Sequence, residues 1–420
     1  MVRMVSARGL LHHSRLCGSV AELNAGTWVA SGESTAAVMP SCCDDANRRK
    51  ARHNGSRSAS WQWCNERRSN HPAPPYENKV RSGADQNKWA ALLTEENCCN
   101  TRQQLEWEPK SCRLVAWNAS QFCSSLGGRG LLVLGDSVSW QWFTELVRAI
   151  HWGLYLTQPD ALAECLEKLT MASADTLVGK QLGGNSWNRG LEFTKWIRLF
   201  KPDIVIAGTG PHIYGEENYI WALATIAESL ASLRTELGAT APTFIWQTIP
   251  GAGCGPEALK ALPSQSTPHF WLNYNTTAYG ALFNYPTFEA RNSFAKAFWA
   301  SRATSHGAVV LDLEPLHYRV DAHKANPLEI DLREARREGM RNPADLGAPF
   351  PIPQRPVFVN HDCMHYCQPG ALHLIPRLLL HLLETSPALA IPQRSGSHRH
   401  EAVWSRPPES AIRDVLNITT

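Results

Sequence analysis

The sequence predicts an α/β fold in which helices cover both faces of a mostly parallel sheet. Short apolar runs of strand length recur at 131–134, 204–207, 243–248 and 309–313. Segments with the periodicity of amphipathic helices lie between these runs, and such alternation is typical of parallel sheets. With 420 residues, of which 43% are hydrophobic, the chain can bury a large core in one domain with extensions.

The first strand and helix of this pattern bring a serine to a position suited to chemistry. The run 131–134 ends in Gly135, Asp136 and Ser137, and a helix is expected over 138–150. Its apolar residues share one face: Val138, Trp142, Phe143, Leu146, Val147 and Ile150. Ser137 should therefore lie at a helix amino terminus and at the carboxyl end of a strand, where open α/β sheets bind ligands.

The remaining elements are expected in order along the chain. Helices are predicted over 191–200, 219–237, 288–304 and about 371–384, between and after the later strands. The segment 331–356 is charged and then proline-rich, which favours a surface insertion. We expect three regions: a loop-rich, cysteine-containing amino-terminal lobe over 1–104, a catalytic domain over 105–385 and a polar, disordered tail over 386–420.

Asp362 and His365 supply the partners that a nucleophilic serine needs. They are three residues apart, so on one turn both side chains can face the same way. His365 would take the Ser137 proton, and Asp362 would hold the imidazole tautomer. Gly-Asp-Ser and Asp-x-x-His each recur by chance in structural turns, but together in one domain they favour catalysis. Asp136 fits a structural hydrogen bond of the turn.

Six blocks in this order resemble the SGNH or GDSL hydrolases, and more closely their trichome-birefringence-like, PC-esterase branch. The resemblance covers roughly residues 20–385. The blocks are Gly26 to Val29; Trp107 to Leu114 with Phe122 and Leu126 to Arg129; the Gly-Asp-Ser strand; Asp203 to Gly210; Tyr318 to His323; and Asp362 to Gly370. The resemblance implies an SGNH-like three-layer fold and the transfer or removal of O-acetyl groups on polysaccharides or glycoconjugates. It implies no bound cofactor, although transfer needs an acetyl donor, acetyl-CoA or another acetyl carrier.

The chain departs from the family pattern at several positions. Trp140 stands where the family usually has an arginine, and Lys324 replaces a proline after the Asp-Ala-His block. The segment 208–212 contains no asparagine, the residue that SGNH hydrolases generally place in the oxyanion hole. These differences indicate a divergent member. The oxyanion would be bound by the N–H groups of Ser137, Gly190 and Gly210, each worth roughly 3 kcal/mol when well placed.

Asp321 and His323 offer a second carboxylate and imidazole after the strand predicted over 309–313. In the resembled family this block lies near the active site, while the later Asp-x-x-His supplies the base. We therefore favour His365 over His323 as the base and expect Asp321, His323 and Trp140 on the substrate side. A structural loop is the alternative for His323.

The sequence does not identify the acceptor of the acyl group. A sugar hydroxyl gives an O-acetyltransferase, the function expected here, whereas water gives an acetyl esterase. A glycan-binding protein without catalysis is the third alternative, but the retained serine, aspartate and histidine argue against it. Sixteen tryptophans suit the faces of sugar rings, although most of them should lie in the core.

Composition favours a protein of an oxidising compartment that binds no nucleic acid. Lys and Arg together number 41 and Asp and Glu 38, so no basic excess points to a polyanion. Twelve cysteines suggest disulfides, and four sequons, starting at Asn54, Asn118, Asn275 and Asn417, agree with the secretory pathway, the Golgi lumen or secretion. Residues 1–20 contain no apolar stretch long enough for a signal core or membrane span, so membrane anchorage is expected only if the natural chain starts earlier.

Metal is the alternative use of the cysteines near the predicted base. His361, Asp362, Cys363, His365 and Cys367 form a dense group of ligand-type residues, and such a run could hold zinc. No second cysteine pair stands at finger-like spacing, so we expect no metal here. Disulfides that hold the Asp-x-x-His loop are the favoured interpretation.

Overall fold

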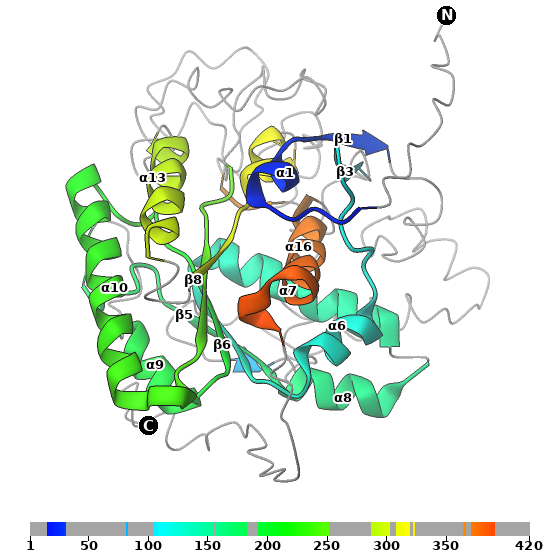
Figure 1. Cartoon of the computed structure of the whole chain (residues 1–420), viewed down its shortest axis with the longest axis horizontal. Coiled ribbons are helices and arrows are strands. Elements are labelled where there is room, and N and C mark those ends of the chain that lie inside the picture. The colour runs from blue at the N-terminus through cyan, green and yellow to red at the C-terminus, as the bar shows by residue number, and fades with distance from the viewer. Residues whose placement is uncertain are drawn as a thin grey trace, which may run out of the picture.

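The six-stranded sheet of this computed structural model lies between two layers of helices (Figure 1). The structure describes residues 15–30, 81–82, 105–154, 157–180, 182, 192–251, 287–302, 308–319, 322–323, 364–366 and 371–390. In spatial order the strands are β2 (Arg81–Ser82), β5 (Leu169–Ser173), β4 (Leu131–Gly135), β6 (Ile204–Ala207), β7 (Thr243–Gln247) and β8 (Ala308–Leu311). All are parallel except β2, which pairs antiparallel with β5. The predicted α/β fold with a mostly parallel sheet is confirmed.

Side chains of the central strand alternate between two cores, because successive residues of a strand point to opposite faces. Leu131 and Val133 pack under the helices α6 (Ala119–Leu126), α7 (Ser137–Leu154), α8 (Pro159–Glu167) and α16 (Leu374–Thr385). Leu132 and Leu134 pack under α9 (Phe193–Phe200), α10 (Glu216–Leu237) and α13 (Phe288–Ala300). Figure 1 shows these two groups of helices on opposite sides of the sheet. Burial on both faces explains why β4 is apolar at every position but its final glycine.

The structure contains the predicted strands and helices, with small shifts at their ends. The strands expected at 131–134, 204–207, 243–248 and 309–313 are β4, β6, β7 and β8, and the helices expected before residue 300 are α7, α9, α10 and α13. The last helix begins as a 3₁₀ turn, η9 (Ala371–His373), and continues as α16. Between residues 110 and 385, the strand and α-helices that the prediction missed are β5, α6 and α8. β5 reads Leu-Thr-Met-Ala-Ser, and its two hydroxyl residues interrupt the apolar run although Thr170 is fully buried.

The first described segment is fastened to the domain by a strand pair and a disulfide. Helix α1 (Val20–Asn24) leads into β1 (Gly26–Ala30), which pairs antiparallel with β3 (Leu105–Pro109). The Trp107 indole donates to the Leu23 carbonyl at 2.7 Å, and Cys17 is bonded to Cys112. Cys17, Leu23 and Trp28 therefore share the core of α7 and α16. The division of the chain at 104 and 385 stays a prediction.

Two disulfides lie among the described residues, Cys17–Cys112 and Cys123–Cys165. They indicate an oxidising environment of the secretory type. Cys363 and Cys367, expected to fasten the Asp-x-x-His loop, lie outside the described residues. In the part of the chain that is described, no helix is both long and apolar enough to cross a bilayer. No group of three or more His, Cys, Asp or Glu side chains suited to a metal occurs in that part either.

Candidate active site

Ser137 is the first residue of α7, and only Asp136 separates it from Gly135, the last residue of β4. The Asp136 carboxylate accepts hydrogen bonds from the backbone N–H groups of Val138 at 3.0 Å and Ser139 at 3.1 Å. These are two of the amide groups that a helix leaves without intrahelical partners, so Asp136 caps α7. The structural role predicted for Asp136 is confirmed, and Ser137 stands at the positive end of the helix dipole.

The His365 imidazole lies against the Ser137 hydroxyl, with Nε2 and Oγ 2.6 Å apart. The two residues are 228 positions apart in the chain, so the contact is made only by the fold. Both are partly exposed, whereas Asp136, Val138 and Ser139 beside them are buried. With Nε2 unprotonated, the hydroxyl donates to the ring, which is the arrangement that general-base activation of a serine needs.

Close approach of neighbouring strand ends shapes the edge of the sheet next to Ser137. β4 and β6 pair side by side, and the Gly208 N–H donates to the Leu134 carbonyl at 3.2 Å. A Cβ on Gly208 would lie 2.8 Å from the Gln247 carbonyl oxygen and 3.1 Å from the Gln247 Cβ. A side chain here would require β7 to move. This packing gives a physical reason why the segment after β6 begins with glycine.

The loop after β6, which carries the predicted oxyanion donor Gly210, is held by Arg291 of α13. The Arg291 guanidinium donates to the carbonyls of Gly210 and Ile213, both at 2.8 Å, and to Gly215 at 3.3 Å. It also bonds the Glu216 carboxylate at 3.1 Å. Arg291 is buried, and its guanidinium adds to the bonds that the loop makes itself, in which the Gly210 carbonyl accepts from the Ile213 N–H at 3.0 Å and the Gly215 carbonyl from the Tyr219 N–H at 3.2 Å.

The other predicted site residues fall in different places. Trp140 is partly exposed on the turn of α7 that follows Ser137, and it packs against the core of that layer. His323 is buried, with its ring 4.1 Å from the Tyr366 ring between centroids, so it is a packed side chain next to the segment that carries His365. Asp362, Asp321 and Gly190 lie outside the described residues, and their predicted roles remain untested.

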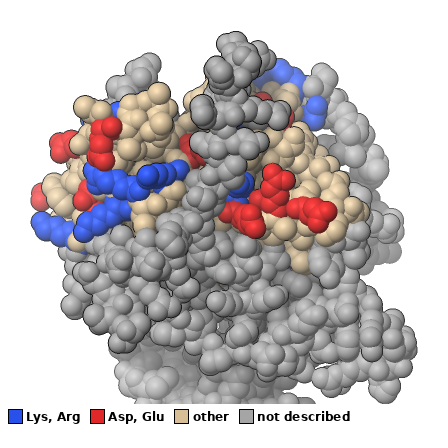
Figure 2. All heavy atoms as spheres, turned by 90° about the horizontal axis from the view of Figure 1, so that it is seen from below, with Lys and Arg blue, Asp and Glu red and all other residues tan. Residues whose placement is uncertain are grey.

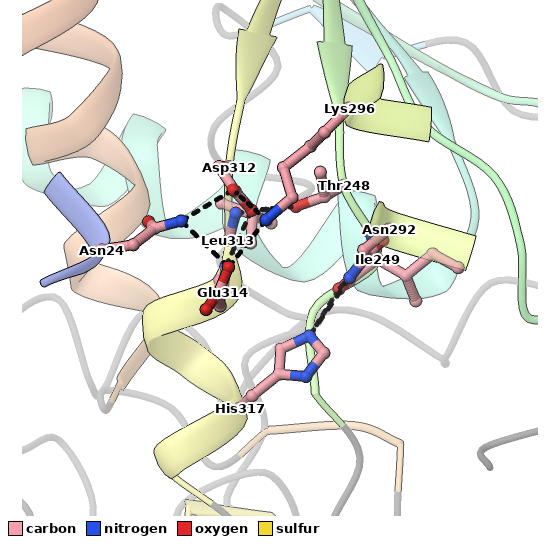
Figure 3. Close-up of polar contacts among 9 residues, drawn as sticks. All are labelled: Asn24, Thr248, Ile249, Asn292, Lys296, Asp312, Leu313, Glu314 and His317. Atoms are coloured by element: carbon pink, nitrogen blue, oxygen red, sulfur yellow. Dashed lines mark hydrogen bonds and ion pairs between the residues drawn. The ribbon is translucent and has the colours of Figure 1, made fainter. Parts of the chain in front are cut away.

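The end of β7 is fixed by a polar network that continues the sheet edge (Figure 3). The Asn292 side chain bonds both backbone groups of Ile249, accepting from its N–H at 2.8 Å and donating to its carbonyl at 2.7 Å. The His317 imidazole contacts the same carbonyl at 3.0 Å. Thr248 Oγ1 donates to the Asp312 carboxylate at 3.0 Å, which joins β7 to the residues after β8. These bonds hold the backbone that leads to Gly251.

Asp312 also belongs to a charged cluster beside α1, drawn in Figure 3. Lys296 lies 2.9 Å from Asp312 and 2.7 Å from Glu314, and the Asn24 amide donates to both carboxylates. Burial lowers the pKa of Lys296, but the two carboxylates outweigh it and raise that pKa. An open hollow of about 700 Å³ lies next to this cluster, between α1 and α13. Because its polar side chains bond one another, the cluster serves to attach α1 to the domain.

Two buried histidines, His317 and His381, and the partly buried His151 make stability sensitive to mild acid. Burial is the largest cause of the lowered pKa of His151, His317 and His381. The unfolded chain therefore binds more protons than the folded one as pH falls through the ordinary histidine pKa of about 6.5. The stability present above that pH is lost below it. We expect the urea midpoint to fall between pH 7.5 and pH 5.5, a window above the titration of carboxylates; an unchanged midpoint would contradict this.

Two residues that hold the site were missed from the sequence. Gln141 lies in the predicted helix 138–150 beside Trp142, and its amide bonds the backbone of Tyr366. Arg291 lies in the helix predicted over 288–304. A polar or charged residue on the buried side of a predicted helix is a usable indication of such a role. Its partner cannot be read from the sequence, because it lies far away in the chain.

Comparison with known protein families finds no family that matches this chain. Comparison with curated proteins finds no match either.

Proposed function

We propose that the protein is an acyl-transfer enzyme that acetylates hydroxyl groups of a polysaccharide or glycoconjugate through an acyl-enzyme on Ser137. The contact of 2.6 Å between Ser137 Oγ and His365 Nε2 carries this proposal. It joins a nucleophile and a base at a partly exposed helix amino terminus, on the sheet edge where α/β folds bind ligands. The finer assignment, a divergent PC-esterase of the SGNH fold, rests on the sequence blocks.

The reaction has two balanced halves. His365 Nε2 takes the Ser137 proton while Oγ bonds the acetyl carbonyl carbon, and the tetrahedral oxyanion then collapses, expelling the donor group with the proton from His365. In the second half His365 takes a proton from the acceptor hydroxyl, whose oxygen attacks the acetyl carbon. Ser137 leaves and recovers its proton. Asp362 is proposed to hold the His365 imidazole in the required tautomer, and it takes part in no proton transfer.

Backbone amides are proposed to stabilise the oxyanion. The Ser137 N–H opens α7, ahead of the two amides that Asp136 binds, and the helix dipole adds to its effect. Gly210 is the second donor proposed, and Gly190 the third. The Arg291 bonds support Gly210 in this role, because a donor that needs no reorganisation stabilises the transition state best.

The acceptor is proposed to be a glycan. Trp140 offers an aromatic surface at the same end of the helix as Ser137, and such a surface suits the face of a sugar ring. The proposed acetyl donor is acetyl-CoA or another acetyl carrier. Among the described residues of the face in Figure 2, basic and acidic side chains both occur, as the near-balanced composition leads one to expect. A neutral or weakly charged glycan in the Golgi lumen fits this better than nucleic acid.

Product analysis separates transferase from esterase. The purified, disulfide-bonded protein would be incubated with an aryl acetate, with and without a neutral oligosaccharide. A transferase gives acetylated oligosaccharide and faster release of the aryl alcohol when the acceptor is present. Acetate as the sole product, at a rate independent of the acceptor, would replace the transferase by an esterase. No turnover beyond that of Ser137→Ala, with oligosaccharide binding retained, would favour the non-catalytic binding protein.

A further inference from the structure

Gln141 connects the helix of the nucleophile to the segment of the base. Its side-chain amide donates to the Tyr366 carbonyl at 3.0 Å and accepts from the Tyr366 N–H at 3.0 Å. Gln141 is only 7% exposed, and Tyr366 is fully buried. One side chain thus pairs both backbone groups of the residue that follows His365.

The position of Gln141 in α7 gives this pair of bonds a geometric consequence. Ser137 and Gln141 are four residues apart, so they lie one turn apart on the same face of the helix. The helix that presents the hydroxyl therefore also fixes the backbone next to the imidazole. Movement of the His365 segment away from Ser137 would break both bonds to Gln141.

Further contacts of Tyr366 fix the segment from other directions. Its phenol donates to the Gly251 carbonyl at 2.7 Å, and its backbone forms an isolated antiparallel bridge with His323. Gly251 follows the end of β7 that Asn292 holds at Ile249 (Figure 3). A Cβ on Gly251 would lie 2.8 Å from the His317 Cα, so this backbone is closely packed as well.

We infer that Gln141 is a positioning residue that sets the distance between Ser137 and His365. The inference rests on the proposed function, and it concerns a residue that touches neither the substrate nor the imidazole ring in that mechanism. A misplacement of about 1 Å between a base and its nucleophile can cost about 100-fold in rate. The two bonds to Tyr366 are contacts of α7 that oppose such a displacement.

Gln141→Met and Gln141→Glu test the inference. Methionine keeps the length of the side chain and loses both bonds, whereas the carboxylate keeps an acceptor for the Tyr366 N–H. His381→Met is the matched control: His381 of α16 is also buried and also bonds two backbone groups, the Val115 N–H at 3.3 Å and the Cys17 carbonyl at 2.9 Å. Rates would be measured with an aryl acetate and with a serine-directed fluorophosphonate, per folded molecule.

For Gln141→Met we expect kcat and the labelling rate of Ser137 to fall about 10- to 100-fold, with KM changed less than about twofold. Gln141→Glu should lie between this variant and the wild type, and His381→Met should match the wild type. In a His365→Ala background the Gln141→Met change should cost nothing further, because its effect passes through His365. An equal loss in that background, or in His381→Met, would show a general structural role and overturn the inference.

Hydrogen exchange at the Tyr366 amide gives a test that needs no activity. It should be faster in Gln141→Met than in the wild type, since the acceptor of that N–H is lost. Unchanged exchange would overturn the inference even in an active enzyme. A different outcome is that the wild type shows neither ester turnover nor labelling, while exchange is still faster in Gln141→Met. That outcome would refute the proposed function, but Gln141 would still be shown to hold the segment around Tyr366.

Discussion

His365→Ala is expected to lose turnover of an aryl acetate by roughly 1000-fold or more, because the Ser137 hydroxyl then has no base to take its proton. The expectation rests on the 2.6 Å contact between the two side chains. His323→Ala should retain measurable turnover. Its ring packs on Tyr366, and losing that contact loosens the base segment without removing the base.

The two histidine variants control for each other, since both remove an imidazole from neighbouring segments. Circular dichroism and a thermal melt would establish that each variant is folded before rates are compared. Equal losses in both variants, or a loss confined to His323→Ala, would overturn the assignment of His365 as the base. Those outcomes would transfer the role to the Asp321 and His323 block.

Arg291→Met is expected to destabilise the fold by about 2–3 kcal/mol, the loss typical of hydrogen bonds from a charged group. Methionine preserves much of the apolar stem but removes the guanidinium from the Gly210 and Ile213 carbonyls, and the loss of hydrogen bonds from a charged donor to buried carbonyls is costly. The contact of the guanidinium with the Tyr219 ring, 5.0 Å from the centroid, is lost too. The free energy of unfolding in urea measures the effect.

Arg198→Met is the matched control for that variant. Arg198 forms an ion pair with Glu236 at 2.8 Å, but both side chains are nearly half exposed, so water competes for the pair. Its loss should change the free energy of unfolding by less than about 1 kcal/mol. Similar effects of the two substitutions would mean that Arg291 does not hold the loop that carries Gly210.

The layers of the fold and the position of Ser137 could be predicted from the sequence alone. The apolar run of β4 and the periodicity of α7 are local properties, and together they put Ser137 at a helix amino terminus. The strand β5 was missed because its buried face includes Thr170, which a local pattern counts as polar. This segment is a strand because it pairs with β2 on one side and β4 on the other, and both partners are distant in sequence.

The polar contacts of the site lie beyond what a local pattern can predict. Gln141 and Tyr366 are separated by 225 positions, and Arg291 and Gly210 by 81. Their bonds exist because the sheet brings α7, α13 and the loops after the strands to one edge. Gly208 could be noted in the sequence, but the reason for a glycine there, its close packing on Gln247, required the structure.

Covalent modification of Ser137 is the most direct test of the account. A serine-directed fluorophosphonate should label this residue alone among the serines of the folded, disulfide-bonded protein, because His365 can activate its hydroxyl. Peptide mass mapping would locate the label, and an acetyl ester should give the same peptide one acetyl group heavier. Ser137→Ala should abolish both while its melting temperature stays close to that of the wild type. A folded protein in which Ser137 remains unmodified by either reagent would contradict the proposed acyl-enzyme.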